Sequence, residues 1–236
     1  MIILYEDYTN YHLNKVDPSN WRYVIAGNGF GNGELQYYTD RIDNLFIDSD
    51  GLHIVGLKEE YSGRHYTSAR IVSNKLFKYG KISFSTKLPK LKGTWPAIWL
   101  LSEDIIKNHN WPECGEIDVM EFIGRMPGKI HSSLHCKDYN HLLSNHRTKV
   151  IDISDNEFHE FVYCWTKNGF SIDIDGKHFE LFKKGPNETY SSWPYDQNYF
   201  LIINMAIGGY FPGEVDPNFK KEEFIIKYLK IETIED

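Results

Sequence analysis

Apolar and polar residues alternate with a period of two along much of this chain. The strand-like pattern is clearest in segments 51–57, 80–88, 158–165, 170–176, 199–203 and 223–231. Successive side chains of a strand point to opposite faces, so this period predicts half-buried β-strands. Asn168-Gly169 separates two of these segments, and Asn-Gly is typical of the tight turn of a β-hairpin.

Helical periodicity is weak. The best candidate is segment 102–107, where Ser102 is expected to cap one or two turns with Glu103 and Asp104 in the first turn. Many short strands with regularly spaced turns favour a sandwich of two antiparallel sheets, so the predicted fold class is all-β. Because the chain shows no internal repeat and no linker rich in Pro, Gly or Ser, residues 1–236 are expected to form one domain.

Composition narrows the classes of function. The 236 residues are 41% hydrophobic and 25% charged, which is ordinary for a globular protein and excludes wholesale disorder. A net charge of −7 gives no basic surface for nucleic acid or anionic lipid, and no apolar run approaches the roughly 18 residues of a membrane helix. We therefore expect a soluble protein, a monomer by default, with neither nucleic acid nor membrane as partner. The 15% of aromatic residues suits a strand-rich fold or a groove that binds a ligand.

The cysteines and the first residues give only limited information on disulfides and on the cellular compartment. Three cysteines, Cys114, Cys136 and Cys164, are an odd number for a disulfide framework, which favours reduced, packed thiols. One disulfide with one free thiol is the alternative. Residues 1–4 are apolar but are followed almost at once by acidic residues, so no secretory signal is expected there and the compartment is left open.

Three carboxylates within six residues form the most informative feature of the sequence. On a regular strand, Glu116 and Asp118 point to one face, while Glu121 falls on the opposite, apolar face. A β-bulge that inserts one extra residue at Val119-Met120 brings Glu121 back beside the other two. Without it, a carboxylate would be buried in the core, which is costly unless it is paired.

Glycosidic hydrolysis is the chemistry that needs this arrangement. Retaining glycosidases use two carboxyl groups roughly 5–5.5 Å apart, one as nucleophile and one as acid and then base. Asp118 is expected to bond to a neighbour and to keep Glu116 ionised while Glu121 stays protonated. Two alternatives are an edge strand that carries charges against aggregation and a cation site made of the three carboxylates.

Several blocks of the sequence together resemble glycoside hydrolase family 16, in its laminarinase-like branch. The acidic stretch Glu116–Glu121 resembles the E-I-D-x-x-E signature of that family, with the bulged spacing. The other blocks, in order, are Gly31–Thr39, Tyr66–Ile71, Gly93–Leu101, Asn204–Gly209 and Pro212-Gly213. The resemblance therefore runs nearly from end to end.

The resemblance implies a β-jelly-roll of two curved antiparallel sheets with the substrate cleft on the concave face. It implies retaining endo-hydrolysis of a β-glucan polysaccharide, with Glu116 as nucleophile, Asp118 as supporting acid and Glu121 as general acid/base. The bulged signature favours a β-1,3-glucanase. The alternatives are a mixed-linkage β-1,3-1,4-glucanase, a galactan-active relative and a non-catalytic glucan-binding protein.

Aromatic and polar residues of the matching blocks are expected to bind the substrate. Trp95, Trp99 and Trp111 would line the cleft, since indole rings stack on the apolar face of a pyranose; the alternative is that they fill the core. Trp95 and Trp99 are four residues apart and share one face of a regular strand. The remaining candidates for substrate contact are Arg70, Asn32 and Glu34. An ordinary structural ion pair is the alternative for Arg70.

Four histidines follow the acidic strand, but their spacing fits no zinc pattern, so no metal site is expected. His135 matches the histidine of the family's G-T-x-H block and is expected near the acid/base, as a residue that tunes its pKa or contacts substrate. The other three, His131, His141 and His146, are expected on loops or at the surface.

Three departures from the family pattern stand out. Gly33 replaces the second Asn of the early block, and Ser132-Ser133 and Cys136 replace the usual neighbours of the matching histidine, His135. These changes are expected to affect contacts with the substrate rather than the reaction. Lys227 stands where many members have an Asp that binds a structural calcium. We therefore expect no calcium cofactor, with the Lys227 ammonium near Glu6 or Asp7 instead.

Overall fold

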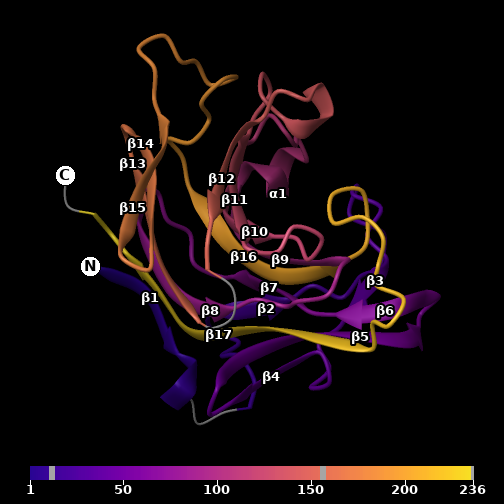
Figure 1. The fold of residues 1–236 in the computed structure, drawn as a ribbon. Helices are drawn as coiled ribbons and strands as arrows, with labels where there is room; N and C mark the ends of the chain where they lie inside the picture. Colours follow the sequence, from indigo (N-terminus) through magenta and orange to yellow (C-terminus); the bar gives the residue numbers. More distant parts are fainter. Residues whose placement is uncertain (11–13, 155–157, 235–236) are drawn as a thin grey trace.

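Two curved sheets pack face to face in the computed structural model, which describes residues 1–10, 14–154 and 158–234 (Figure 1). The larger sheet has ten strands, in the order β15-β14-β13-β8-β17-β5-β6-β3, with β1 beside β17 and β4 beside β5. The smaller sheet has seven strands, in the order β12-β11-β10-β9-β16-β7-β2. The described strand pairs are antiparallel except β3 with β6, which is parallel. The all-β class and the two-sheet jelly-roll are confirmed.

The strands have these bounds. In the larger sheet they are β1 Ile2–Asp7, β3 Gln36–Tyr38, β4 Leu45–Asp48, β5 Gly51–Tyr61, β6 Arg64–Ser68, β8 Gly80–Lys87, β13 His159–Thr166, β14 Gly169–Ile174, β15 Lys177–Lys183 and β17 Lys221–Glu232. In the smaller sheet they are β2 Trp21–Tyr23, β7 Arg70–Ser73, β9 Thr94–Ser102, β10 Glu116–Phe122, β11 Lys129–His135, β12 Arg147–Asp152 and β16 Tyr199–Ile207. Each of the six segments with a strand-like pattern coincides with a strand to within two residues at either end or lies inside one, and β13 and β14 form the hairpin that Asn168-Gly169 predicts.

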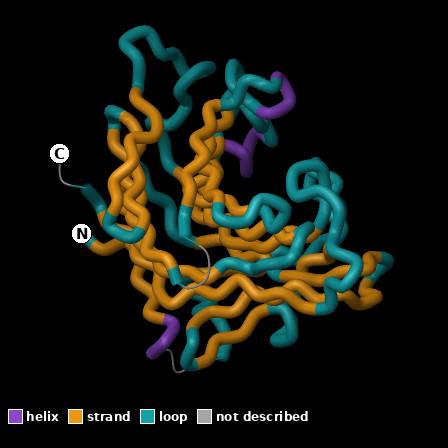
Figure 2. The backbone as a smooth tube through the Cα atoms, in the orientation of Figure 1, coloured by secondary structure: helices purple, strands orange, loops and turns teal. Residues whose placement is uncertain are grey.

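Helices are short and lie outside the sheets (Figure 2). They are α1 Asp104–Asn108 and the 3₁₀ turns η1 Tyr8–Asn10 and η2 His141–Leu143. The expected start of α1 needs correction, because Ser102 is the last residue of β9. Its Oγ still accepts a hydrogen bond of 3.2 Å from the backbone N–H of Asp104, so the serine satisfies one N–H of the first turn from within the strand.

The core lies between the two sheets and takes the apolar side of each strand. On β8 and β13, Phe84 and Phe161 are fully buried and stack with ring centroids 4.8 Å apart. On β10, Ile117, Val119 and Met120 are fully buried in the same core. The face of the seven-stranded sheet that points away from this core is concave (Figure 1) and is the face that carries the acidic residues.

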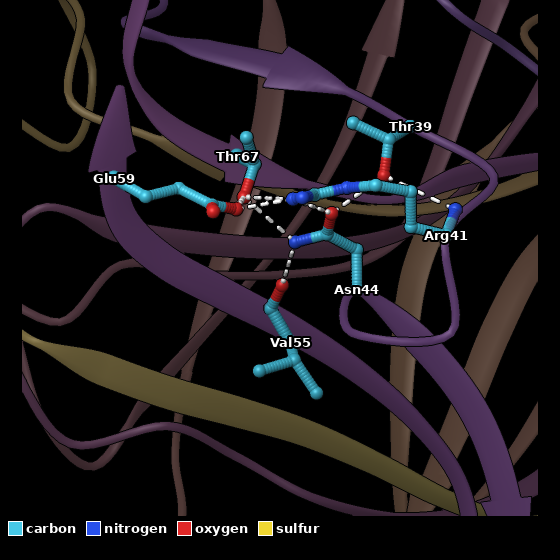
Figure 3. A network of polar contacts seen from close by, with 6 residues as sticks. All are labelled: Thr39, Arg41, Asn44, Val55, Glu59 and Thr67. Atoms are coloured by element: carbon cyan, nitrogen blue, oxygen red, sulfur yellow. Dashed lines mark hydrogen bonds and ion pairs between the residues drawn. The ribbon is translucent and has the colours of Figure 1, made fainter. Parts of the chain in front are cut away.

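A polar network ties the segment after β3 to the neighbouring strands (Figure 3). Asn44 Nδ2 donates to the carbonyl of Val55 at 3.1 Å and to Thr67 Oγ1 at 2.9 Å. The Arg41 guanidinium donates to Asn44 Oδ1 at 3.0 Å and pairs with Glu59. The network fixes the end of β3 against β5 and β6, and β3 supplies two residues of the site described below.

The three cysteines are free thiols, as the odd number indicates. Among residues 1–10, 14–154 and 158–234, no helix is both long and apolar enough to cross a membrane.

Candidate active site

A β-bulge in β10 determines which way the acidic side chains point. In the pairing with β11, the two residues Val119 and Met120 lie opposite the single residue Ser132. The pairing with β9 shifts at the same place. Both bulge residues are fully buried in the core, so the extra residue turns the next side chain, Glu121, to the concave face. The predicted bulge is confirmed.

The three carboxyl groups therefore share one face. Residues that pair directly across two strands point to the same side, and Asp118 pairs with Trp99 and Glu121 with Ala97. Asp118 is 4% exposed and Glu121 9% exposed, whereas Glu116 is half-buried at the start of the strand.

Two indole groups donate hydrogen bonds to the two outer carboxyl groups. Trp95, on β9, donates from Nε1 to Glu121 Oε1 at 3.0 Å. Trp111, in the loop between α1 and β10, donates from Nε1 to Glu116 Oε2 at 3.0 Å. Both tryptophans are half-buried on the concave side, so the alternative in which they fill the core does not apply to them.

His135 lies against the middle carboxylate. Its Nε2 is 3.1 Å from Asp118 Oδ2, and its backbone pairs with Glu116 across β10 and β11. His135 lies at the Glu116 end of the row, and His131 is the residue paired with Glu121. His135 still acts electrostatically to lower the pKa of Glu121, in line with the expected tuning of the acid/base.

Burial raises the pKa of all three carboxyl groups, because the ionised form loses its hydration. The pKa of Glu116 rises to about 8 through burial and, second, the charge of Asp118. Burial raises the pKa of Asp118 to about 8, although a hydrogen bond with Glu116 opposes the rise. The pKa of Glu121 lies well above its usual range, through burial and then the Asp118 charge. The raised pKa of Glu121 is in line with the proton expected on it, whereas a pKa of Glu116 raised to about 8 runs against the expected ionisation of that group.

The expectation of loop or surface positions holds for two of the remaining histidines, since His141 is exposed and His146 lies in the loop before β12, but it is wrong for His131. His131 is on β11, 8% exposed, and its ring contacts Phe211 edge-on at 5.3 Å. His146 is half-buried and stacks on His135, with centroids 5.1 Å apart and planes 12° apart. Only His141, on η2, is exposed, and its ring lies 5.1 Å from that of Trp111.

Trp99 begins a hydrogen-bonded chain across the concave face. Its Nε1 donates to Asn204 Oδ1 at 2.7 Å, and Asn204 Nδ2 donates to the Tyr38 hydroxyl at 3.1 Å. Tyr38 in turn donates to Glu34 Oε2 at 3.1 Å, and Gln36 donates to the same oxygen at 2.6 Å. Because the buried Glu34 anchors the far end of this chain, the chain fixes the orientation of Trp99.

Arg70 lies beside this chain on β7. Its guanidinium lies over the rings of Phe30 and Trp99, with its carbon 5.1 and 4.9 Å from the centroids. Among the described residues Arg70 makes no ion pair within 4 Å, and its buried Nε has no hydrogen-bond partner. The ion-pair alternative is therefore wrong, and Arg70 fixes the plane of Trp99 from one side.

The early glycine-rich block packs against the segment after β16. Asn32 Nδ2 donates to Glu34 Oε1 at 3.3 Å, and its carbonyl accepts from the backbone N–H of Tyr210 at 2.8 Å. Gly33 has φ +68°, and a Cβ there would meet the Tyr210 ring at 3.2 Å. The replacement of Asn by Gly therefore lets Tyr210, 84% exposed, lie close to this loop.

Four residues of the site have no role in the sequence interpretation. Tyr38 and Asn204 lie in two of the matching blocks but link Trp99 to Glu34 only through the meeting of three segments. Phe211 contacts Trp95 edge-on at 5.4 Å, and Phe30 covers Arg70. Aromatic residues are common in strands and turns, so no local signal distinguishes these from core residues.

Lys227, at the expected calcium position, contacts an aromatic ring. Lys227 Nζ lies 3.9 Å from the ring centroid of Phe158, and among the described residues it pairs with neither Glu6 nor Asp7. Glu6 accepts hydrogen bonds from Asn20 and from Trp21. The expected position of the Lys227 ammonium is therefore wrong, while the lack of calcium binding stays a prediction.

Two carboxyl groups on one face of a curved sheet, each with its own indole donor and with a third carboxyl between them, are the kind of arrangement that glycoside hydrolases use. Residues 29–229 match the family model described as "Glycosyl hydrolases family 16", and the chain belongs to this family. It is 37% identical to a beta-glucanase of Rhodothermus marinus over 91% of this chain and 79% of the relative. It is 31% identical to a glucan endo-1,3-beta-glucosidase of Cryptopygus antarcticus, over 89% of this chain and 85% of the relative.

Solved structures agree with this assignment. The X-ray structure of the laminarinase from Rhodothermus marinus superimposes with a TM-score of 0.92 at 34% identity, covering 99% of this chain and 98% of that one. The likeness extends over both sheets, so it includes the strands that carry the carboxyl groups.

Proposed function

We propose that this glycoside hydrolase is a retaining endo-β-1,3-glucanase that cleaves internal bonds of a laminarin-like glucan. The observation that carries the proposal is the row of Glu116, Asp118 and Glu121 on one concave face, created by the bulge in β10. The names of the similar proteins, glucan endo-1,3-beta-glucosidase and laminarinase, support the choice of linkage.

The different surroundings of the two outer carboxyl groups support their roles. The pKa of Glu121 lies well above its usual range, so this group carries a proton that it can donate to the glycosidic oxygen. As that C–O bond breaks, Glu116 attacks the anomeric carbon through a carboxylate oxygen and forms a glycosyl ester. Glu121, now ionised, then takes a proton from water, whose oxygen displaces Glu116 and restores the original anomeric configuration.

Asp118 and the tryptophans position these groups. Asp118 shares a hydrogen bond with Glu116. When the two groups hold one proton between them, that proton can reside on Asp118, so that Glu116 is ionised and ready to attack. The Trp111 and Trp95 indoles hold the two carboxyl groups, and Trp99 is held in place by Asn204 and Arg70 as a surface for a pyranose ring.

The test compares laminarin, barley mixed-linkage glucan and agarose oligomers as substrates. The wild type is expected to release mid-sized oligosaccharides from laminarin, with the β-anomer formed first in an NMR time course. Glu116→Gln and Glu121→Gln should each lower kcat by about 10³-fold or more, because each removes a group that acts in the transition state. Glu180→Gln, a change on the exposed part of β15, is the matched control and should leave kcat unchanged.

Azide separates the two roles. Azide should restore activity to both alanine variants, but with different products. In Glu116→Ala it takes the place of the missing nucleophile, attacks the anomeric carbon of the substrate and gives an α-glycosyl azide. In Glu121→Ala it attacks the glycosyl ester on Glu116 and gives a β-glycosyl azide. An α-anomer as first product of the wild type, or near-normal activity of either Gln variant, would contradict the proposed mechanism. Faster cleavage of barley glucan or agarose oligomers would replace the proposed substrate and leave the mechanism in place.

A further inference from the structure

Donor atoms of three different chemical groups converge at one end of the carboxyl row. Glu116, Asp118 and His135 each offer one atom, two carboxylate oxygens and an imidazole nitrogen, and these atoms all lie within 4.8 Å of one another. His135 comes from β11 and the two acids from β10, so only the pairing of the strands brings them together.

Two members of the group are buried and incompletely bonded. Asp118 is 4% exposed and His135 6% exposed. Within the described part of the chain, Asp118 Oδ2 has no hydrogen-bond partner of good geometry, although it lies 3.1 Å from His135 Nε2. The other ring nitrogen of His135, Nδ1, has no partner either, but it is not the nitrogen beside Asp118. Buried polar atoms without partners are uncommon and call for an explanation, such as a ligand that the protein takes up.

The charge of the row also favours a cation. Three carboxyl groups share this face, two of them buried and Glu116 half-buried, and within the described residues no lysine or arginine pairs with any of them. Arg70, the arginine whose charge acts on Glu116, lies over the rings of Phe30 and Trp99. A bound divalent ion would supply the missing positive charge.

We propose that Glu116, Asp118 and His135 form a binding site for a divalent late transition-metal ion, with Zn²⁺ as the probe, and that the bound ion inhibits the enzyme. One imidazole and two carboxylates suit Zn²⁺, whereas Ca²⁺ and Mg²⁺ prefer all-oxygen ligands. Zn–N and Zn–O bonds near 2.0–2.2 Å place tetrahedral ligands about 3.4 Å apart. The half-buried Glu116 is the member free to close this gap, because Trp111 holds only one of its oxygens.

His146 and His141 hold the imidazole ring of His135 in place. His146 stacks on His135 and His141 contacts its ring edge-on at 5.3 Å, so the imidazole plane is held on two sides. With three protein donors, the other coordination positions are left to water. Ion binding occupies the carboxylate that attacks the sugar, so ion and glucan exclude each other.

Binding of the ion does not depend on the proposed function, but inhibition rests on it, and the test measures the two separately. Titration calorimetry with ZnCl₂ in a non-chelating buffer should show one ion per chain. Co²⁺ should give the visible absorption bands of a nitrogen- and oxygen-ligated site. His135→Gln and Asp118→Asn should each weaken Zn²⁺ binding at least 10-fold, with unchanged circular dichroism as the check on folding.

His178→Gln is the matched control, because His178 also lies beside two acids, Asp173 and Glu180, but is exposed on β15. It should leave both Zn²⁺ binding and activity unchanged. A laminarin oligosaccharide should weaken Zn²⁺ binding, and EDTA should restore hydrolysis. The inference is overturned if the wild type shows no saturable binding, or if His135→Gln and Asp118→Asn, both folded, bind Zn²⁺ as tightly as the wild type. Zn²⁺ binding without cleavage of any glucan would overturn the proposed function alone.

Discussion

At the scale of single residues, two indole N–H groups act on the protons of the outer carboxyl groups. Each N–H bonds to a carboxylate oxygen and so favours the ionised form, against the burial that disfavours it. Trp111 acts on Glu116 and Trp95 on Glu121, so each tryptophan is expected to control one limb of the pH profile.

Replacement of either tryptophan by Phe removes the donor and raises the pKa of its carboxyl group. In Trp111→Phe the acidic limb of kcat/KM, where Glu116 must lose its proton, should move to higher pH by about one to two units, since a hydrogen bond to a charged group contributes about 1.5–3 kcal/mol. In Trp95→Phe the alkaline limb, where Glu121 must keep its proton, should move to higher pH instead. Trp99→Phe is the control, because its N–H bonds to the Asn204 amide. It should lower activity and shift neither limb; shifts of the same limb in both test variants would contradict the assignment.

At the scale of elements, the bulge in β10 determines the face on which Glu121 lies. Five positions separate Glu116 from Glu121, an odd number that puts them on opposite faces of a regular strand. One extra residue in the ladder makes the count even. The site therefore requires an even number of ladder positions between Glu116 and Glu121, and it does not depend on which residues form the bulge.

Deletions in the bulge test this parity. Removal of Met120 alone makes β10 regular and keeps Glu121 on the concave face, so the variant should fold, less stable by about 2–5 kcal/mol for the lost core side chain, with detectable hydrolysis of laminarin. Removal of Val119 and Met120 together turns Glu121 into the core, where an unpaired carboxylate is costly. This variant should show a further fall in melting temperature and no hydrolysis. Equal stability and activity of the two deletions would show that parity does not matter.

At the scale of the whole molecule, the carboxyl row lowers stability as the pH rises. The pKa of each group is higher in the folded chain than in the unfolded chain, because the two sheets and their loops remove water from it. The folded state therefore binds more protons than the unfolded state above about pH 4, and this contribution to stability is complete below that pH and lost as the pH rises through about 8.

Glu121→Gln removes one of these titrations while keeping the shape and the Trp95 contact. Its melting temperature should exceed that of the wild type by several degrees at pH 8 and should match it below about pH 4, as measured by calorimetry at both pH values. Glu180→Gln, at an exposed carboxyl group, should show no such difference. A stabilisation of Glu121→Gln that is the same at both pH values would mean that burial of the charge is not its cause.

Much of the architecture follows from local pattern. The period-two alternation predicts β5, β8, β16, β17 and the β13–β14 hairpin, because a half-buried strand requires it along its own length. The short α1 is less well predicted, since Ser102 can belong to a strand and still cap the following turn.

The sequence by itself determined the carboxyl row. Glu116, Asp118 and Glu121 lie on one strand, and both their faces and the need for a bulge follow from counting along that strand. The matching blocks also placed Trp95, Trp99 and Trp111 on the concave side.

Only the tertiary structure decided what lies beside these residues. His131 and His146 face the row, Lys227 lies over Phe158, and Tyr38 meets Asn204, all across segments far apart in the chain. The raised pKa of Glu116 has the same origin, because burial depends on every segment that excludes water from the group. Spacing along a strand determines the face of a side chain, but its neighbours across the sheet depend on pairing and packing, which no local pattern contains.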